Sequence, residues 1–146
     1  MTRGRFATSL GSAVAVASPI PLPLPSPFPA SLPSLAVYHV RESVKAAAPI
    51  SPDRLLTYPG VAIVVTTDRT AIAAAYAAID AARAQTREPD EFDARWALRF
   101  ATATERFVHS ASCDARGTAG LLDGRPVTFA NGVALVAFLA TRFGPA

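Results

Sequence analysis

The hydrophobic positions of this chain recur mostly at the three- and four-residue spacing of an amphipathic helix. Over residues 35–48 this spacing is carried by Val37, Val40 and Val44, and Pro49 supplies a stop. Comparable spacing continues through most of the rest of the chain. The pattern therefore predicts further helices at about residues 69–86, 90–112 and 130–143.

The predicted helix over residues 90–112 carries the strongest periodic signal. Phe92, Trp96, Phe100 and Phe107 fall within one narrow arc of a helical wheel. Acidic residues stand in its first turn, where the helix dipole favours negative charge. We therefore expect a buried aromatic stripe along this helix.

One segment departs from helical spacing. Residues 61–65 form a short continuous run rich in β-branched residues and flanked by turn-forming residues, which predicts a buried strand. Asp123 and Gly124 are typical of a tight turn, and Pro126 limits the segment after this turn to a short edge hairpin or a loop. The predicted fold class is mainly α, with three to four helices and one short strand or hairpin.

The last predicted helix is apolar on every side. No polar residue occurs between Val133 and Ala140, yet the helix is too short to cross a bilayer. Such a helix has to be surrounded by its own domain or by a partner subunit. For the second case, we predict self-association through Val133, Val136, Leu139 and Phe143.

A proline-rich arm over residues 18–33 separates an N-terminal segment, 1–33, from a single helical domain, 34–146. Each proline fixes φ and biases its predecessor to extended geometry, so the arm is expected to be extended and close to polyproline II. Two interpretations stay open, a linker and an arm that lies on a neighbouring surface. The apolar residues of the arm that favour the second are Leu22, Leu24 and Phe28.

The first 17 residues suit a targeting peptide. Arg3 and Arg5 precede a moderately apolar stretch, and Ala15 and Ala17 fit a small-residue cleavage site, as in a secretory signal. The absence of acids before Glu42 also suits an organelle transit peptide, and an uncleaved flexible arm is the third interpretation. The sequence leaves the compartment undecided.

Length and charge limit the remaining function classes. A chain of 146 residues has room for one domain, and no apolar stretch reaches the roughly 18 residues that span a bilayer. The formal charge is +3, but all eleven acidic and twelve of the fourteen basic residues lie in residues 41–146. That part is nearly neutral, so it has no general field that would attract a polyanion.

The remaining candidate chemistry is sparse. On a helical wheel Arg95, Arg99 and Arg106 line one edge of the aromatic stripe, an arrangement used to bind single-stranded nucleic acid. The alternative is that their stems cover the edge of the core. His109 and Cys113 stand four residues apart and could share a face, but no third group completes a catalytic or metal site. We predict no cofactor and no metal.

These observations predict a non-enzymatic structural or interaction subunit that forms a homo-oligomer through its apolar arm and C-terminal helix. Contact with nucleic acid is a weaker part of the same hypothesis. The alternative is a small exported or organelle-targeted protein with a cleaved N-terminus and an unknown ligand. An enzyme comes third, because no nucleophile elbow, phosphate loop or metal motif is present in the sequence.

Overall fold

The computed structural model describes residues 33–102 and 107–144. Within these residues the chain forms seven strands and three helices. In chain order they are β1 (Ser34–His39), α1 (Pro52–Leu55), β2 (Ala62–Thr66), α2 (Arg69–Ala81), β3 (Ala84–Thr86), β4 (Trp96–Ala101), β5 (Phe107–Cys113), β6 (Ala119–Leu122), β7 (Arg125–Phe129) and α3 (Gly132–Phe143).

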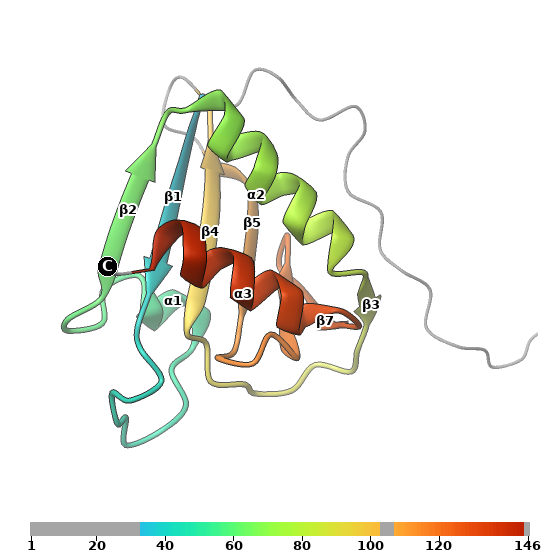
Figure 1. Ribbon diagram of the computed structural model, residues 1–146. Helices are drawn as coiled ribbons and strands as arrows, with labels where there is room; N and C mark the ends of the chain where they lie inside the picture. Colours follow the sequence, from blue (N-terminus) through green and yellow to red (C-terminus); the bar gives the residue numbers. More distant parts are fainter. Residues whose placement is uncertain (1–32, 103–106, 145–146) are drawn as a thin grey trace, which may run out of the picture.

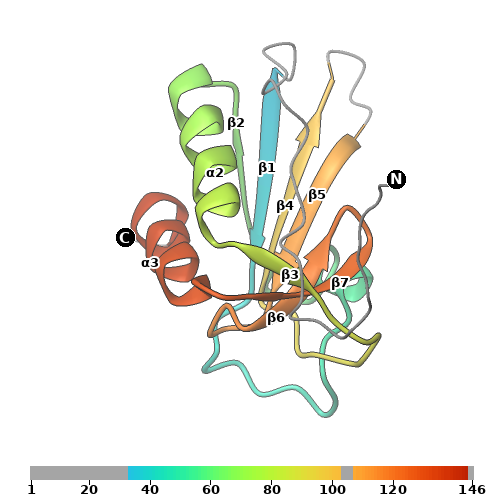
Figure 2. The same ribbon diagram turned by 90° about the vertical axis from the view of Figure 1, so that its right-hand side faces the viewer.

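The strands form one antiparallel sheet with the order β2-β1-β4-β5-β6-β7-β3. Helices α2 and α3 lie side by side on one face, while the short α1 lies on the other (Figure 1). The sheet is twisted so strongly that β3 and β7 lie at a steep angle to β1 and β4 (Figure 2). The prediction of a mainly α fold is therefore wrong, since the sheet dominates the architecture.

Two predicted helices are strands. Residues 35–48 form β1 and a loop, and residues 90–112 form a loop followed by most of the hairpin β4–β5. The cause lies in the spacing of the large side chains. Trp96 and Phe100 are four residues apart, an even number, so they share a face in a strand as well as in a helix. Leu98 lies between them on the same face, which is the alternation of a half-buried strand.

The other predicted elements are confirmed, with adjusted bounds. A strand forms at β2, and Asp68 caps α2 by accepting a hydrogen bond from the backbone N–H of Thr70 at 3.1 Å. Helix α2 ends earlier than predicted because Arg83 takes a left-handed conformation, with φ 59°, and the chain then enters β3. The turn at Asp123 and Gly124 joins β6 to β7, but the prediction that Pro126 limits this segment to an edge hairpin or a loop is wrong, because β7 also pairs with β3.

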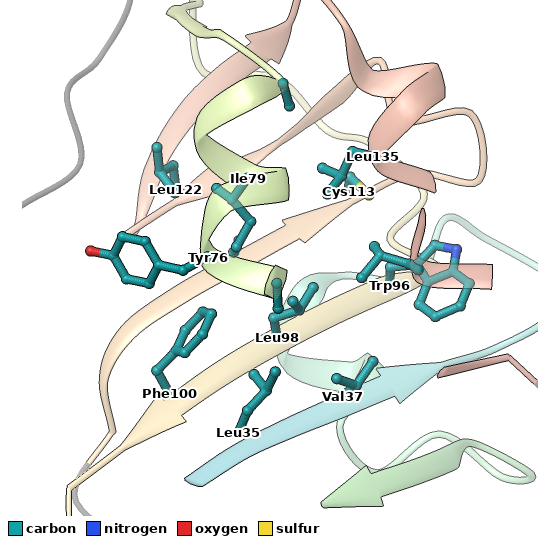
Figure 3. Close-up of a cluster of buried hydrophobic side chains, with 14 of the residues drawn as sticks. Leu35, Val37, Tyr76, Ile79, Trp96, Leu98, Phe100, Cys113, Leu122 and Leu135 are labelled. Carbon is teal, nitrogen blue, oxygen red and sulfur yellow. The ribbon is translucent and has the colours of Figure 1, made fainter. Parts of the chain in front are cut away.

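The main core lies between the sheet and the two long helices (Figure 3). Alternate residues of the central strands point into it, and the ring of Tyr76 from α2 meets that of Phe100 edge-on at 5.4 Å. A second, smaller cluster fills the space between the opposite face and the 41–61 segment that carries α1. Its buried members are Val40, Ile50, Leu55, Ala94 and Ala97.

Within residues 33–102 and 107–144, none of the helices is long and apolar enough to cross a membrane.

Candidate interaction surface

The two edges of the sheet differ in how well they are protected. At one edge β3 is only three residues long, which limits what can pair with it. At the other edge β2 is five residues long and pairs with β1 alone among the described strands. Figure 1 shows β2 at the outer left of the sheet, with no other described element beside its free side.

The side chains of β2 are apolar and exposed. Ile63 is 51% exposed, Val64 38% and Val65 65%. In the register with β1, Val64 lies opposite the core residue Val37, so Ile63 and Val65 point to the face away from α2 and α3. The prediction of a buried strand here is right about the strand and wrong about its burial.

Local interactions hold both ends of β2. Gly60 takes a positive φ of 83° in the turn before the strand, and the N–H of Val61 donates to the carbonyl of Tyr58 at 2.9 Å. After the strand, the hydroxyl of Thr66 accepts from the N–H of Asp68 at 3.1 Å. The edge is therefore presented in a fixed extended conformation.

None of the usual protective features of an edge strand occurs in β2. Natural sheets discourage edge-to-edge pairing with charged side chains, proline, bulges or very short strands. Residues 61–67 contain no charged residue, no proline and no glycine, and the ladder with β1 runs without a register shift. Within residues 33–102 and 107–144, the free side of β2 is therefore a template on which another strand can pair.

The structure separates the residues that the sequence assigned to self-association. Leu139 and Phe143 are 0% and 7% exposed and belong to the core of the chain itself, and Val136 packs against that core. Val133 is 77% exposed, but the other exposed positions of α3 up to Ala140 are alanines. Leu22, Leu24 and Phe28 lie outside the described residues. Val133 is therefore the one exposed large apolar side chain among the described residues of α3, and Val136 and Phe138 beside it are partly buried.

Of the three arginines assigned to nucleic acid, the two that the structure describes are not gathered along one edge of an aromatic stripe. Arg95 is 5% exposed, and its guanidinium bonds to Asp93 and to two backbone carbonyls. Arg99 lies on β4 between Leu98 and Phe100, so its side chain leaves the opposite face of the sheet. Arg106 lies outside the described residues. The predicted edge of an aromatic stripe depended on a helix that does not form.

Other titratable groups are used within the fold. Cys113 is buried, and burial raises its pKa to about 12, which leaves it without thiolate character. His109 shares its strand face, but its Nδ1 lies 3.2 Å from Oδ2 of Asp123. The ring of His39 stacks on Trp96 with centroids 3.6 Å apart, and its Nδ1 is buried without a hydrogen-bond partner. Within the described part of the chain, no three His, Cys, Asp or Glu residues could hold a metal ion.

A cavity of about 200 Å³ lies between α1 and the face of the sheet opposite α2 and α3. Asp53 and Leu56 line it from the α1 segment, and Arg99, Ser110 and Ser112 line it from β4 and β5. None of the described residues that line it is a histidine or cysteine. The cavity offers polar contacts but no paired nucleophile and base.

Comparison of the chain with protein-family models, curated protein sequences and solved structures finds no significant match.

Proposed function

We propose that this chain is a non-enzymatic interaction subunit that self-associates, and that the outer edge of β2 is the surface at which it receives a strand of a second copy. The observation that carries the proposal is the uncharged outer edge of β2, which no described strand pairs with and which exposes Ile63, Val64 and Val65. An edge of this kind binds an extended segment through backbone hydrogen bonds, and its side chains supply apolar contact.

A second copy of the chain is the partner that the composition favours. The run from Val61 to Thr67 carries no charge, so it offers no electrostatic complementarity to a partner with a charged surface. The same chain also contains a long apolar segment, residues 18–33, in front of the domain. The chain itself therefore contains both an uncharged edge strand and an apolar extended segment, which are the two features that self-association at this edge requires.

The energetics limit what the edge contributes. Burying the exposed parts of these three side chains contributes about 1 kcal/mol each, and each strand hydrogen bond adds about 1 kcal/mol. Association costs at least about 4 kcal/mol in lost translational and rotational freedom. A five-residue edge alone therefore supports weak association, and a stable complex requires further apolar surface from the second copy.

The test is the mass of the full-length chain in solution, measured by light scattering across a range of concentrations. We expect the wild-type chain to form an oligomer and Val65→Lys to be monomeric with unchanged unfolding stability, because Val65 is 65% exposed. Val133→Lys is the matched control, since Val133 is even more exposed but lies on α3. A monomeric wild-type chain, or dissociation by Val133→Lys and not by Val65→Lys, contradicts the proposal.

The alternative function, an exported or organelle-targeted protein with a cleaved N-terminus, is tested by the intact mass of the protein purified from its source. Loss of residues 1–17 supports targeting and is compatible with self-association, because the proline-rich arm begins at Ser18. Nucleic-acid contact through Arg95, Arg99 and Arg106 stays a prediction, and no described contact favours it as a second function.

A further inference from the structure

We propose that the strand paired with the outer edge of β2 is the proline-rich arm, residues 18–30, of a second copy. This inference rests on the proposed self-association and names the segment responsible for it. Two independent features support it: the direction of the backbone groups on β2 and the positions of the prolines in the arm.

The ladder fixes which residues of β2 face outward. The backbone N–H of Val40, the residue after β1, donates across to the residue that precedes β4, at 3.0 Å. Since successive residues of a strand direct their backbone groups to opposite sides, the odd-numbered residues of β1 face β2. Val37 is paired with Val64, so Val64 faces back to β1. Ile63 and Val65 therefore direct their N–H and C=O groups to the free edge.

The prolines of the arm follow the same two-residue period. Every proline from Pro19 to Pro29 has an odd number, with six in eleven residues. In an extended strand, all odd-numbered residues direct their backbone groups to one side and all even-numbered residues to the other. Paired as a β-strand, the arm would therefore have one side without N–H donors and one side with a complete set over residues 19–29. Proline occurs in sheets mainly where its nitrogen does not have to donate to the ladder, and an edge strand with the nitrogen facing away from its neighbour is one such arrangement.

The side chains of the arm follow from the same alternation. The even-numbered residues share one face of the extended arm, and most of them are apolar: Ile20, Leu22, Leu24, Phe28 and Ala30. In an antiparallel pair with β2, residues that exchange hydrogen bonds with Ile63 and Val65 place their side chains on the same face as these two. The arm would cover the most exposed apolar side chains of the edge and supply the apolar surface that β2 alone lacks.

The geometry at the start of β1 favours the arm of a second copy over the arm of the same chain. Leu35 pairs with Thr66, so the arm leaves its own domain at the end of β2 where the chain passes into α2. To reach the outer edge of its own β2, the arm would have to reverse and cross two strand spacings of about 4.8 Å each. Reciprocal exchange around a two-fold axis needs no such reversal and gives two contacts for each pair of copies.

The arrangement also limits the size of the assembly. Once the arm occupies β2, the outer side of the new strand carries carbonyl oxygens but no N–H donor, so it offers a further strand only part of the usual ladder hydrogen bonds. Extension of the sheet beyond this eighth strand is therefore disfavoured, and the expected product is a closed dimer rather than a fibre.

The experiment places proline on the pairing side of the arm in the full-length chain. Leu22→Pro with Leu24→Pro removes two N–H donors, and we expect dimerisation to weaken more than tenfold. Leu22→Ala with Leu24→Ala removes the side chains but keeps the donors, and it should weaken the dimer less. Pro23→Ala changes the outer side of the arm and should leave the dimer intact. The readout is the dimer fraction in native mass spectrometry.

A mixing experiment tests whether the arm of one copy binds the β2 edge of another copy. The Leu22→Pro, Leu24→Pro chain keeps an intact edge, and an isotope-labelled Val65→Lys chain keeps an intact arm. If arms are exchanged, the mixture forms a mixed dimer through one arm–edge contact, although neither chain dimerises alone. No mixed dimer means that the arm does not bind the edge of a second copy, which overturns the inference.

The outcomes separate this inference from the proposed function. A dimer that survives the two proline substitutions but is lost with Val65→Lys overturns the role of the arm and leaves self-association through β2. A wild-type chain that is monomeric overturns both.

Discussion

Substitution of Arg95 tests whether its buried guanidinium stabilises the fold or contacts nucleic acid. Its side chain is 6% exposed and connects the start of β4 to the 41–44 segment. Nη1 bonds to the carbonyl oxygens of Arg41 at 2.6 Å and Val44 at 2.9 Å, and Nε bonds to Oδ2 of Asp93 at 2.9 Å. Arg95→Met keeps the apolar stem and removes all three bonds.

The expected loss comes mainly from the two carbonyls. A hydrogen bond from a charged donor is worth about 1.5–3 kcal/mol, whereas the pair with Asp93, a residue that is 41% exposed, contributes less than about 1 kcal/mol. Part of the stability lost with these bonds is regained in the variant, because burying methionine does not require the desolvation of a charge. We therefore expect Arg95→Met to lower the free energy of unfolding by about 3–4 kcal/mol.

The assay is urea unfolding followed by fluorescence of Trp96, the single tryptophan, with linear extrapolation to water. Asp93→Asn is the control and should cost less, since it leaves both carbonyl bonds of Arg95 in place. A loss below about 1 kcal/mol for Arg95→Met, together with weaker RNA binding, would refute the structural role and support the nucleic-acid hypothesis.

Two further predictions concern Gly132, at the start of α3, and His39, at the end of β1. In the same urea titration, Gly132→Ala should destabilise the fold by about 3 kcal/mol or more, because a Cβ there would overlap the carbonyl of Gly117. Gly124→Ala is the control and should cost only about 1 kcal/mol, since a Cβ at that position meets open space and only the positive φ of 81° is unfavourable. Burial, with smaller effects from the charges of Arg41 and Arg95, lowers the pKa of His39 below its usual 6.5. As the pH falls, the unfolded chain therefore binds this proton before the folded chain does, and the free energy of unfolding should decrease below pH 6.5. His39→Phe should make that decline shallower, and an unchanged pH profile would show that His39 does not cause it.

The elements that sequence reasoning identified are those with strong local signals. Asp68 before a helical pattern, Gly124 after an aspartate and a β-branched run each determine local structure through capping, turn geometry or side-chain shape. These signals act between residues close in sequence, so they determine the local structure largely independently of the tertiary fold. They located α2, α3, β2 and the β6–β7 turn close to their observed places.

The fold class was missed because the strongest signal fits both periods. A spacing of four places Trp96 and Phe100 on one face in a helix and in a strand, and the alanines between large residues favour a helix by propensity. The deciding influence is tertiary: Trp96, Leu98 and Phe100 fill the core beneath α2, and β1 and β5 satisfy the backbone on both sides. Pairing partners about 60 residues away leave little trace in local spacing.

The candidate site was missed for a related reason. A run of Ile63, Val64 and Val65 has the composition of a strand buried on both faces, and composition contains no information about whether the covering surface belongs to the same chain. In the single copy these side chains lie at an edge, 38–65% exposed. The apolar composition of β2 and its exposure in a single copy are consistent with each other if a second copy of the chain buries these side chains. If the arm of that copy pairs there as a strand, with its odd-numbered prolines on the side that lacks N–H donors, the prediction of burial and the observation of exposure describe two states of one strand.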